Sequence, residues 1–400
     1  MNKTNNQIVR TNLSMLIFIL CLAGSLLRVL GTPMIPSSVS LLYICVFFYL
    51  FCNYYTFRTI TKLRPLVFWL LLTIYHLVNA KMHNVSEINY ADFLHGFKVY
   101  ASICIFTFFL YVDYAKSLKY LIASFLIYVF VNLVLCGFVM RREDGEEGII
   151  TAVAFGKSGY MIAIFIVYYC TIKGYSFLKL LKFMIIPILI TLYAQTRTAF
   201  AVVLMQIMGF YYSVVLKTKL NLKNATISII LVFICYLGVS FMLNNSKLGE
   251  RFTTDNYSTN QERIGIKTGT IFDEIAGERL TYYVIGWNLF LENPITGIGL
   301  DEYQHATGGD YPMHVEYMKH LTEGGIIGAF LFLSFLISLA IEIKNADVDK
   351  RIRWLVIFTF ISNLFLYIYS SSYKQEMSVI IYSIIISIAL KDSALARKYK

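Results

Sequence analysis

Residues 277–328 read GERLTYYVIGWNLFLENPITGIGLDEYQHATGGDYPMHVEYMKHLTEGGIIG. This stretch is polar and rich in glycine, whereas most of the remaining chain consists of long apolar runs. It ends directly against one of these runs, which begins near Ile326. Polar sequence that passes abruptly into a long apolar run predicts a helix that enters a membrane from an aqueous face. We expect any chemistry to take place where this stretch meets the membrane.

The composition indicates a membrane protein. The chain has 400 residues, of which 58% are hydrophobic and 15% charged, whereas a soluble domain has about half apolar and about a quarter charged residues. The 30 Tyr and 31 Phe fit a chain with many membrane–water boundaries, where aromatic rings accumulate. The net charge of +11 is spread over short loops between apolar runs, which is typical of a topology signal. We therefore expect the lipid bilayer, and no nucleic acid, as a partner.

The apolar runs predict an all-α polytopic membrane protein. A membrane span needs about 20 apolar residues. With this criterion the sequence predicts about twelve transmembrane helices, of which the third and the last are short. They lie near residues 12–30, 39–57, 65–80, 98–114, 119–140, 150–171, 179–196, 198–216, 225–243, 326–343, 354–371 and 376–390.

The charges of the loops predict the orientation. With the N-terminus in the cytoplasm, every predicted cytoplasmic segment carries more than one Lys or Arg, as the positive-inside rule requires. Lys3 and Arg10 precede a long apolar run that has no small-residue cleavage site, which favours a retained first span. The predicted organisation is spans one to nine in residues 1–243, a large extracytoplasmic loop in residues 244–325, and three spans with a cytoplasmic tail in residues 326–400.

The large loop is predicted to be partly helical. From Arg279 to Asn293, an apolar stripe recurs at helical spacing, and Pro294 is expected to end the helix. The stripe consists of Leu280, Val284, Trp287 and Leu291. Such a helix would lie on the outer leaflet with Trp287 at the membrane–water interface.

Two cations lie at the predicted outer face of the spans. Arg197 stands between two apolar runs, and its guanidinium group has the fixed fork of donors that matches phosphate oxygens. The alternative is a loop arginine that reaches the lipid headgroups. Lys157, near the start of the sixth predicted span, is a second candidate cation.

Arg279 opens the predicted loop helix, where a positive charge opposes the helix dipole. An anionic ligand would explain this placement, and a salt bridge to Glu274 or Glu278 is the alternative. His314 is the favoured general base, because an unperturbed imidazole accepts protons near neutral pH. His305 and His320 are its rivals.

Glycines surround the entry into the tenth predicted span. Gly297 and Gly299 follow Pro294 and predict a tight turn, while Gly325 and Gly328 would let other backbone approach closely. The seven cysteines all lie in apolar runs, which favours packing roles. The sequence contains no metal-ligand spacing, so we predict neither a metal site nor a cofactor.

These motifs together resemble the O-antigen ligase and polymerase superfamily. The resemblance rests on three pieces in this order: Thr196-Arg197-Thr198-Ala199-Phe200 opening a span, Gly-x-Arg-Leu-x-x-Tyr-x-x-Gly-x-Asn-x-Phe-x-x-x-Pro from Gly277 to Pro294, and His314-x-x-Tyr317 followed by Glu323-x-Gly325-x-x-Gly328. The motifs cover about residues 190–330, and the resemblance in topology covers the whole chain.

The resemblance implies a metal-independent, inverting glycosyltransferase with a GT-C-like membrane fold. Its donor would be a glycan on undecaprenyl diphosphate at the periplasmic face of the bacterial inner membrane. Arg197 and Arg279 match the family's diphosphate-binding arginines, and His314 matches the histidine that activates the acceptor hydroxyl. We add Lys157, Trp287, Tyr317 and Glu323 as candidate residues for binding diphosphate or acceptor. The sequence departs from the family at Val315, where asparagine is frequent, and at Thr196, where serine is frequent.

Three functions remain in view from the sequence. The Gln-Thr-Arg and Gly-x-Arg-Leu-x-x-Tyr pieces look closer to a ligase, which would join finished polysaccharide to a lipid A–core sugar. A repeat-unit polymerase would use the same donor chemistry. A transporter of lipid-linked sugar would be expected to carry charges in several spans, and the middles of the predicted spans are nearly free of charge.

Overall fold

The computed structural model describes residues 63–83, parts of 99–111, 114–135, 152–194, 196–215, 279–307, 313, 315–369 and 376–390. These residues are helical or lie in turns, and no strand occurs among them. The helices are α4 (Arg64–Met82), α6 (Tyr114–Leu135), α7 (Ala152–Lys173), α8 (Phe177–Tyr193), α9 (Arg197–Phe210), the π-helical turn η1 (Tyr211–Val215), α14 (Arg279–Glu292), α15 (Tyr303–Thr307), α16 (Glu316–Asn345), α17 (Lys350–Tyr369) and α18 (Glu376–Ala389).

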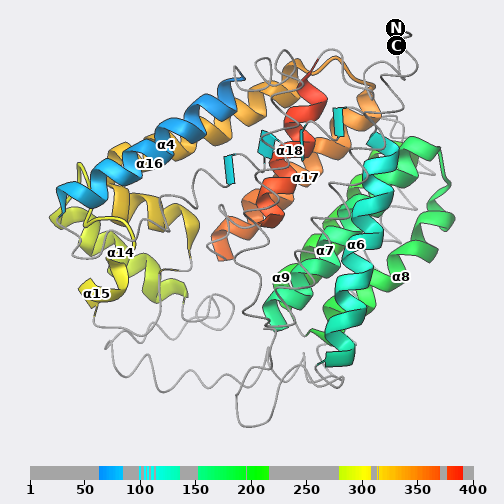
Figure 1. Cartoon of the computed structure of the whole chain (residues 1–400), viewed down its shortest axis with the longest axis horizontal. Helices are drawn as coiled ribbons and strands as arrows, with labels where there is room; N and C mark the ends of the chain where they lie inside the picture. Colours follow the sequence, from blue (N-terminus) through cyan, green and yellow to red (C-terminus); the bar gives the residue numbers. More distant parts are fainter. Residues whose placement is uncertain are drawn as a thin grey trace, which may run out of the picture.

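The helices form two groups that α17 connects. In the first group α16 packs along α4 and also contacts α14 and α18, and in the second α7 packs against α6, α8 and α9. Because α17 contacts both α16 and α9, it lies between the groups (Figure 1). Helices α14 and α15, which come from the polar stretch 277–328, lie beside one end of the α4–α16 pair (Figure 1).

Local sequence explains several helix ends. Pro65 occupies the first turn of α4, where its missing N–H has no helical partner to lose. Gly174 has a φ of 66° after α7, and the Ser176 side chain accepts a hydrogen bond from the Lys179 amide at the start of α8. Helix α14 ends before Pro294, as the sequence predicts.

Four of the described helices are long and apolar enough to span a membrane: Arg64–Met82, Phe155–Lys173, Glu316–Asn345 and Lys350–Ile368. Shorter apolar helices cover Thr198–Val214 and Ser378–Ala389. The exposed face of α4 is an apolar stripe of Val67, Leu71, Ile74 and Val78, and α16 exposes Ile326, Phe330 and Ile337. Such faces are expected on helices that contact lipid. The helical membrane character is thus confirmed in the described residues.

The finer prediction of twelve spans stays a prediction. The predicted spans near 12–30, 39–57 and 225–243 lie outside the described residues, and the one near 98–114 is described only in part. The other predicted spans each coincide with a helix. The predicted spans near 179–196 and 198–216 are separated as expected, with α8 ending at Tyr193 and α9 beginning at Arg197.

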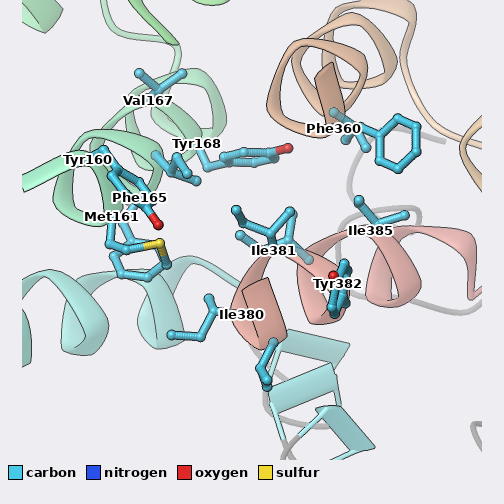
Figure 2. Close-up of a cluster of buried hydrophobic side chains, with 14 of the residues drawn as sticks. Tyr160, Met161, Phe165, Val167, Tyr168, Phe360, Ile380, Ile381, Tyr382 and Ile385 are labelled. Carbon is cyan, nitrogen blue, oxygen red and sulfur yellow. The ribbon is translucent and has the colours of Figure 1, made fainter. Parts of the chain in front are cut away.

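Buried side chains of α7, α17 and α18 meet in one apolar cluster. Figure 2 shows Tyr168 of α7, Phe360 of α17 and Ile381 of α18 in this cluster. A polar seam crosses the same helices: the Tyr168 hydroxyl donates to Thr359 Oγ1 at 3.2 Å, and Gln206 Nε2 of α9 donates to Ser362 Oγ at 2.9 Å. Hydrogen bonds between helices stabilise membrane bundles, because lipid offers these groups no partner.

Candidate functional site

Helix α16 is interrupted at Gly325, where the predicted polar stretch passes into the span. Gly325 has φ 61° and ψ −162°, which no helix contains. The front half, Glu316–Gly324, is therefore a separate helical segment from the span that follows. The segment Pro294–Gly299 lies against this break, with the Ile298 amide donating to Thr322 O at 3.0 Å and the Ile326 amide donating to Pro294 O at 2.9 Å. The close backbone approach expected from the glycines is present here.

Helix α4 holds the same break from the other side. The Tyr75 hydroxyl donates to Gly324 O at 2.6 Å, and Asn79 Nδ2 donates to Thr296 O at 2.6 Å. His83 Nε2 lies 3.3 Å from Thr296 Oγ1. Tyr75, Asn79 and His83 are spaced by about one helical turn each, so they form one polar edge of α4.

The turn that contains Arg197 packs closely on α7. Thr196 is the N-cap of α9, and a Cβ at Gly156 of α7 would lie 1.9 Å from Thr196 Oγ1. Only glycine at position 156 therefore permits this approach. Arg197 is the first residue of α9, although its side chain lies outside the described part. The N-terminal end of a helix carries partial positive charge, which favours an anion there.

Lys157 connects this region with the start of α16. It follows Gly156 directly, and its charge interacts with that of Glu316, which is 0% exposed. Glu316 is the first residue of α16. His314 itself lies outside the described residues, but its neighbours Met313 and Val315 are both buried.

The Glu316 carboxylate lies beside a buried group of stacked rings from α4 and α16. His320 Nε2 lies 3.2 Å from Glu316 Oε1, and His320 is 2% exposed. The His320 ring stacks on Phe332 at 4.0 Å and on His76 of α4 at 5.4 Å. His320, a rival base in the sequence, is therefore a packed residue of the helix interface. A carboxylate this deeply buried needs partners, and Lys157 and His320 are two of them.

Glu323, a predicted substrate-binding residue, is turned toward the loop after α14. Its Oε2 accepts the Asp301 amide at 3.0 Å, and Lys319 Nζ lies 3.7 Å away. Lys319 also pairs with Asp301 Oδ1 at 2.5 Å. Asp301 has a φ of 59°, so this network holds a backbone conformation that non-glycine residues rarely adopt. In the part of the chain that the structure describes, no three His, Cys, Asp or Glu side chains gather closely enough to hold a metal ion.

Helix α14, which begins at Arg279, packs on the front half of α16. The Tyr283 hydroxyl interacts electrostatically with that of Tyr317, and Tyr317 donates to Leu364 O of α17 at 3.3 Å. Gly286 is so close to α16 that a Cβ there would lie 2.8 Å from Thr322 Oγ1, and this hydroxyl donates to Gly286 O at 3.0 Å. The Arg279 side chain lies outside the described part. The start of α14 is nevertheless one turn from Tyr283, and hence near the His314 end of α16.

Trp287 lies away from this contact. It is 49% exposed on α14 and packs on Phe290, with Leu291 and Ile295 exposed on the same stretch. The exposed apolar face fits the predicted interfacial position of this helix. The structure places Gly156, the neighbour of Lys157, against Thr196 at the start of α9. Lys157 also interacts electrostatically with Glu316 at the start of α16. The roles predicted for Trp287 and Glu323 stay predictions.

The comparison with protein families agrees with this geometry. Residues 182–333 match the family model described as O-antigen ligase. The resemblance to the O-antigen ligase and polymerase superfamily is thereby confirmed over these residues. The matched O-antigen ligase domain runs from within α8 to within α16 and contains Arg197, Arg279 and His314. No curated protein matches the chain.

Sequence reasoning missed Glu316, His76, Tyr75 and Asn79. A signal for each of them was available. Polar side chains inside an apolar span are costly and usually face a partner, and Tyr75, His76 and Asn79 interrupt the apolar run of α4. Glu316 and His320 are spaced i, i+4, which places them on one helix face.

Proposed function

We propose that the protein is an O-antigen ligase of the bacterial inner membrane. It transfers undecaprenyl-diphosphate-linked polysaccharide en bloc to a lipid A–core sugar at the periplasmic face, with inversion and without a metal ion. The observation that carries the proposal is the packing of α14 on the front half of α16, where Thr322 Oγ1 donates to Gly286 O at 3.0 Å. This packing lies within the matched family domain and supports a site shared by the Arg279 and His314 ends of the two helices.

The proposed reaction is a single displacement at the anomeric carbon. His314 accepts the proton of the acceptor hydroxyl, whose oxygen forms the new bond to that carbon. The bond from the carbon to the diphosphate oxygen breaks, and its electron pair leaves with undecaprenyl diphosphate. A general base contributes about 10²–10⁴-fold to such a step. Attack on the face opposite the leaving group inverts the anomeric centre.

The cations stabilise the negative charge of the leaving group in this proposal. Arg197 and Arg279 bind the diphosphate and stabilise the charge that develops on it, with Lys157 close to Arg197 through the Gly156–Thr196 contact. Preorganised donors in a site sheltered from water contribute several kcal/mol, or roughly 10²–10³-fold for each donor. The amides at the starts of α9 and α14 add further positive potential.

The organisation proposed for the chain rests on its apolar runs and loop charges, and it places the reaction in the periplasm. Residues 1–243 form nine spans, residues 244–325 the periplasmic loop with the catalytic motifs, and residues 326–400 three spans and a cytoplasmic tail. Both termini are then cytoplasmic. A GT-C-like arrangement of twelve helices belongs to the same proposal, and so does lipid A–core as the acceptor.

The alternative is a polymerase of O-antigen or capsular repeat units. It would use the same donor and the same base, and only the acceptor would differ. The ligase is favoured by Gln195-Thr196-Arg197 and by the Gly-x-Arg-Leu-x-x-Tyr piece that begins at Gly277. The Tyr of this piece is Tyr283, whose hydroxyl interacts electrostatically with that of Tyr317.

Deletion of the gene separates the two functions. In a lipopolysaccharide gel of the deletion strain, we expect bare lipid A–core, with long polymer still on the lipid carrier. Lipid A–core with a single repeat unit would instead identify a polymerase. An unchanged ladder in the deletion strain would contradict both functions, and a plasmid with the wild-type gene controls for effects on neighbouring genes.

Chelation tests the metal-free mechanism. We expect the purified protein to transfer glycan at an unchanged rate after treatment with EDTA, because two arginines and a histidine supply the charge and the base. The measurement is transfer to lipid A–core in detergent, with and without added Mg²⁺ or Mn²⁺. Activity that is lost on chelation and restored by a divalent ion would contradict the proposal.

A further inference from the structure

We infer that Tyr75 and Asn79 of α4 are positioning residues for the transfer reaction. The inference rests on the proposed function, and it concerns two side chains outside the matched family domain, which begins at residue 182. They act on the reaction through the break in α16, because they bind the two backbone segments that meet there.

The break removes three hydrogen bonds from α16, and other parts of the chain replace them. In a continuous helix the carbonyls of Thr322, Glu323 and Gly324 would accept the amides four residues later. Instead, Thr322 O accepts the Ile298 amide at 3.0 Å and Glu323 O accepts the Gly299 amide at 3.1 Å. Gly324 O accepts the Tyr75 hydroxyl at 2.6 Å.

The segment Pro294–Gly299 makes hydrogen bonds to α16 on one side and to α4 on the other. Its carbonyls at Pro294 and Ile295 accept the Ile326 and Ile327 amides at 2.9 and 3.4 Å. On the α4 side, Thr296 O accepts Asn79 Nδ2 at 2.6 Å. We call the contact between the break in α16 and the segment Pro294–Gly299 the joint. Tyr75 binds the α16 side of the joint and Asn79 binds the segment, from adjacent turns of one helix. An unsatisfied carbonyl is costly in a buried or lipid-facing position, so these bonds persist.

The joint determines the direction of the front half of α16. This half is followed by the span and preceded by Val315, so its tilt sets the position of Val315, the residue next in the chain to the proposed base His314. The part of the proposed donor site at Arg197 is built separately, from α7 and α9. Loss of the Tyr75 or Asn79 bond should therefore misalign the base with the donor while leaving the binding of the donor at Arg197 in place. Small displacements of reacting groups can lower rates by about 10²-fold.

The test compares Tyr75→Phe and Asn79→Leu with Tyr168→Phe in the purified full-length protein. Tyr168 is a matched control, because its hydroxyl also makes a hydrogen bond between helices but lies in the α7–α17 seam. We expect kcat for glycan transfer to fall about tenfold or more in both α4 variants, with a smaller change in the KM for the lipid-linked donor. Tyr168→Phe should keep the wild-type kcat.

Amide hydrogen exchange of the segment 294–299 provides a readout that does not depend on activity. In both α4 variants its amides should exchange faster than in the wild type and in Tyr168→Phe, because the joint opens more often. Faster exchange with a wild-type kcat would overturn the positioning role, and so would an equal loss of kcat in Tyr168→Phe. If the wild type transfers no glycan while the exchange still responds, the proposed function fails, and with it the role of the joint in that reaction.

Discussion

Replacing Arg279 or His314 with alanine should abolish glycan transfer while the protein stays in the membrane at wild-type level. His314→Ala removes the proposed base, which contributes about 10²–10⁴-fold. Arg279→Ala removes a charge that stabilises the leaving diphosphate, worth about 10²–10³-fold. The measurement is transfer by purified variants, together with restoration of the lipopolysaccharide ladder in the deletion strain.

Two variants serve as controls for these substitutions. His305→Ala removes an exposed histidine of α15 from the same polar stretch, and Arg351→Ala removes an exposed arginine that pairs with Asp349 at 3.2 Å near the start of α17. Both should keep wild-type transfer, since both side chains are exposed. If His305→Ala abolished transfer and His314→Ala did not, His305 would be the base. Variants of Arg279 or His314 that vanish from the membrane would indicate a structural role instead.

Gly325→Ala should strongly destabilise the protein and abolish transfer. The backbone at Gly325 has a φ of 61° with an extended ψ, a combination that costs other residues about 1–3 kcal/mol. A Cβ there would also lie 2.3 Å from Ile295 O, which real contacts do not allow. The variant must therefore displace the segment Pro294–Gly299, which in turn holds Thr322 and Glu323. We expect a lower unfolding temperature in detergent and no transfer.

Two other glycine substitutions separate the backbone strain from the steric clash. Gly174→Ala has a similar φ of 66° but nothing within 4 Å of the added Cβ, so it carries the backbone strain alone. Gly324→Ala would meet only Tyr75 Cε1 at 3.6 Å, an ordinary contact. We expect the unfolding temperature to decrease in the order Gly324→Ala, Gly174→Ala, Gly325→Ala. Equal stability of Gly325→Ala and Gly324→Ala would show that the break is not required for folding.

Much of the local structure could be predicted from the sequence. The helix from Arg279, its end before Pro294 and the tight turn at Arg197 all depend on residues close together in the chain, and all are present. Apolar runs located the spans that the structure describes, because hydropathy is a property of a single segment. The motifs of the candidate site are local and could be found in the sequence, and the matched family domain spans Arg197, Arg279 and His314, whose roles stay predictions.

The long-range contacts could not be predicted in this way. Lys157 was expected to contact substrate, and the structure adds its interaction with Glu316, far along the chain. Glu323 was expected to bind substrate, but it accepts the Asp301 amide and lies near Lys319. Which partner a charged side chain finds depends on the packing of other helices. Neither composition nor spacing contains that information.

The sequence by itself determined the helical membrane character, the position of the polar stretch and the glycines that permit a break. Only the tertiary structure decided that α16 is interrupted at Gly325 and that the segment Pro294–Gly299 supplies the missing hydrogen bonds. Tyr75 and Gly324 are 249 positions apart, yet one hydrogen bond joins them. Glycine only allows an unusual backbone conformation. Whether the chain adopts it depends on the partners that the surrounding helices bring to the exposed amides and carbonyls.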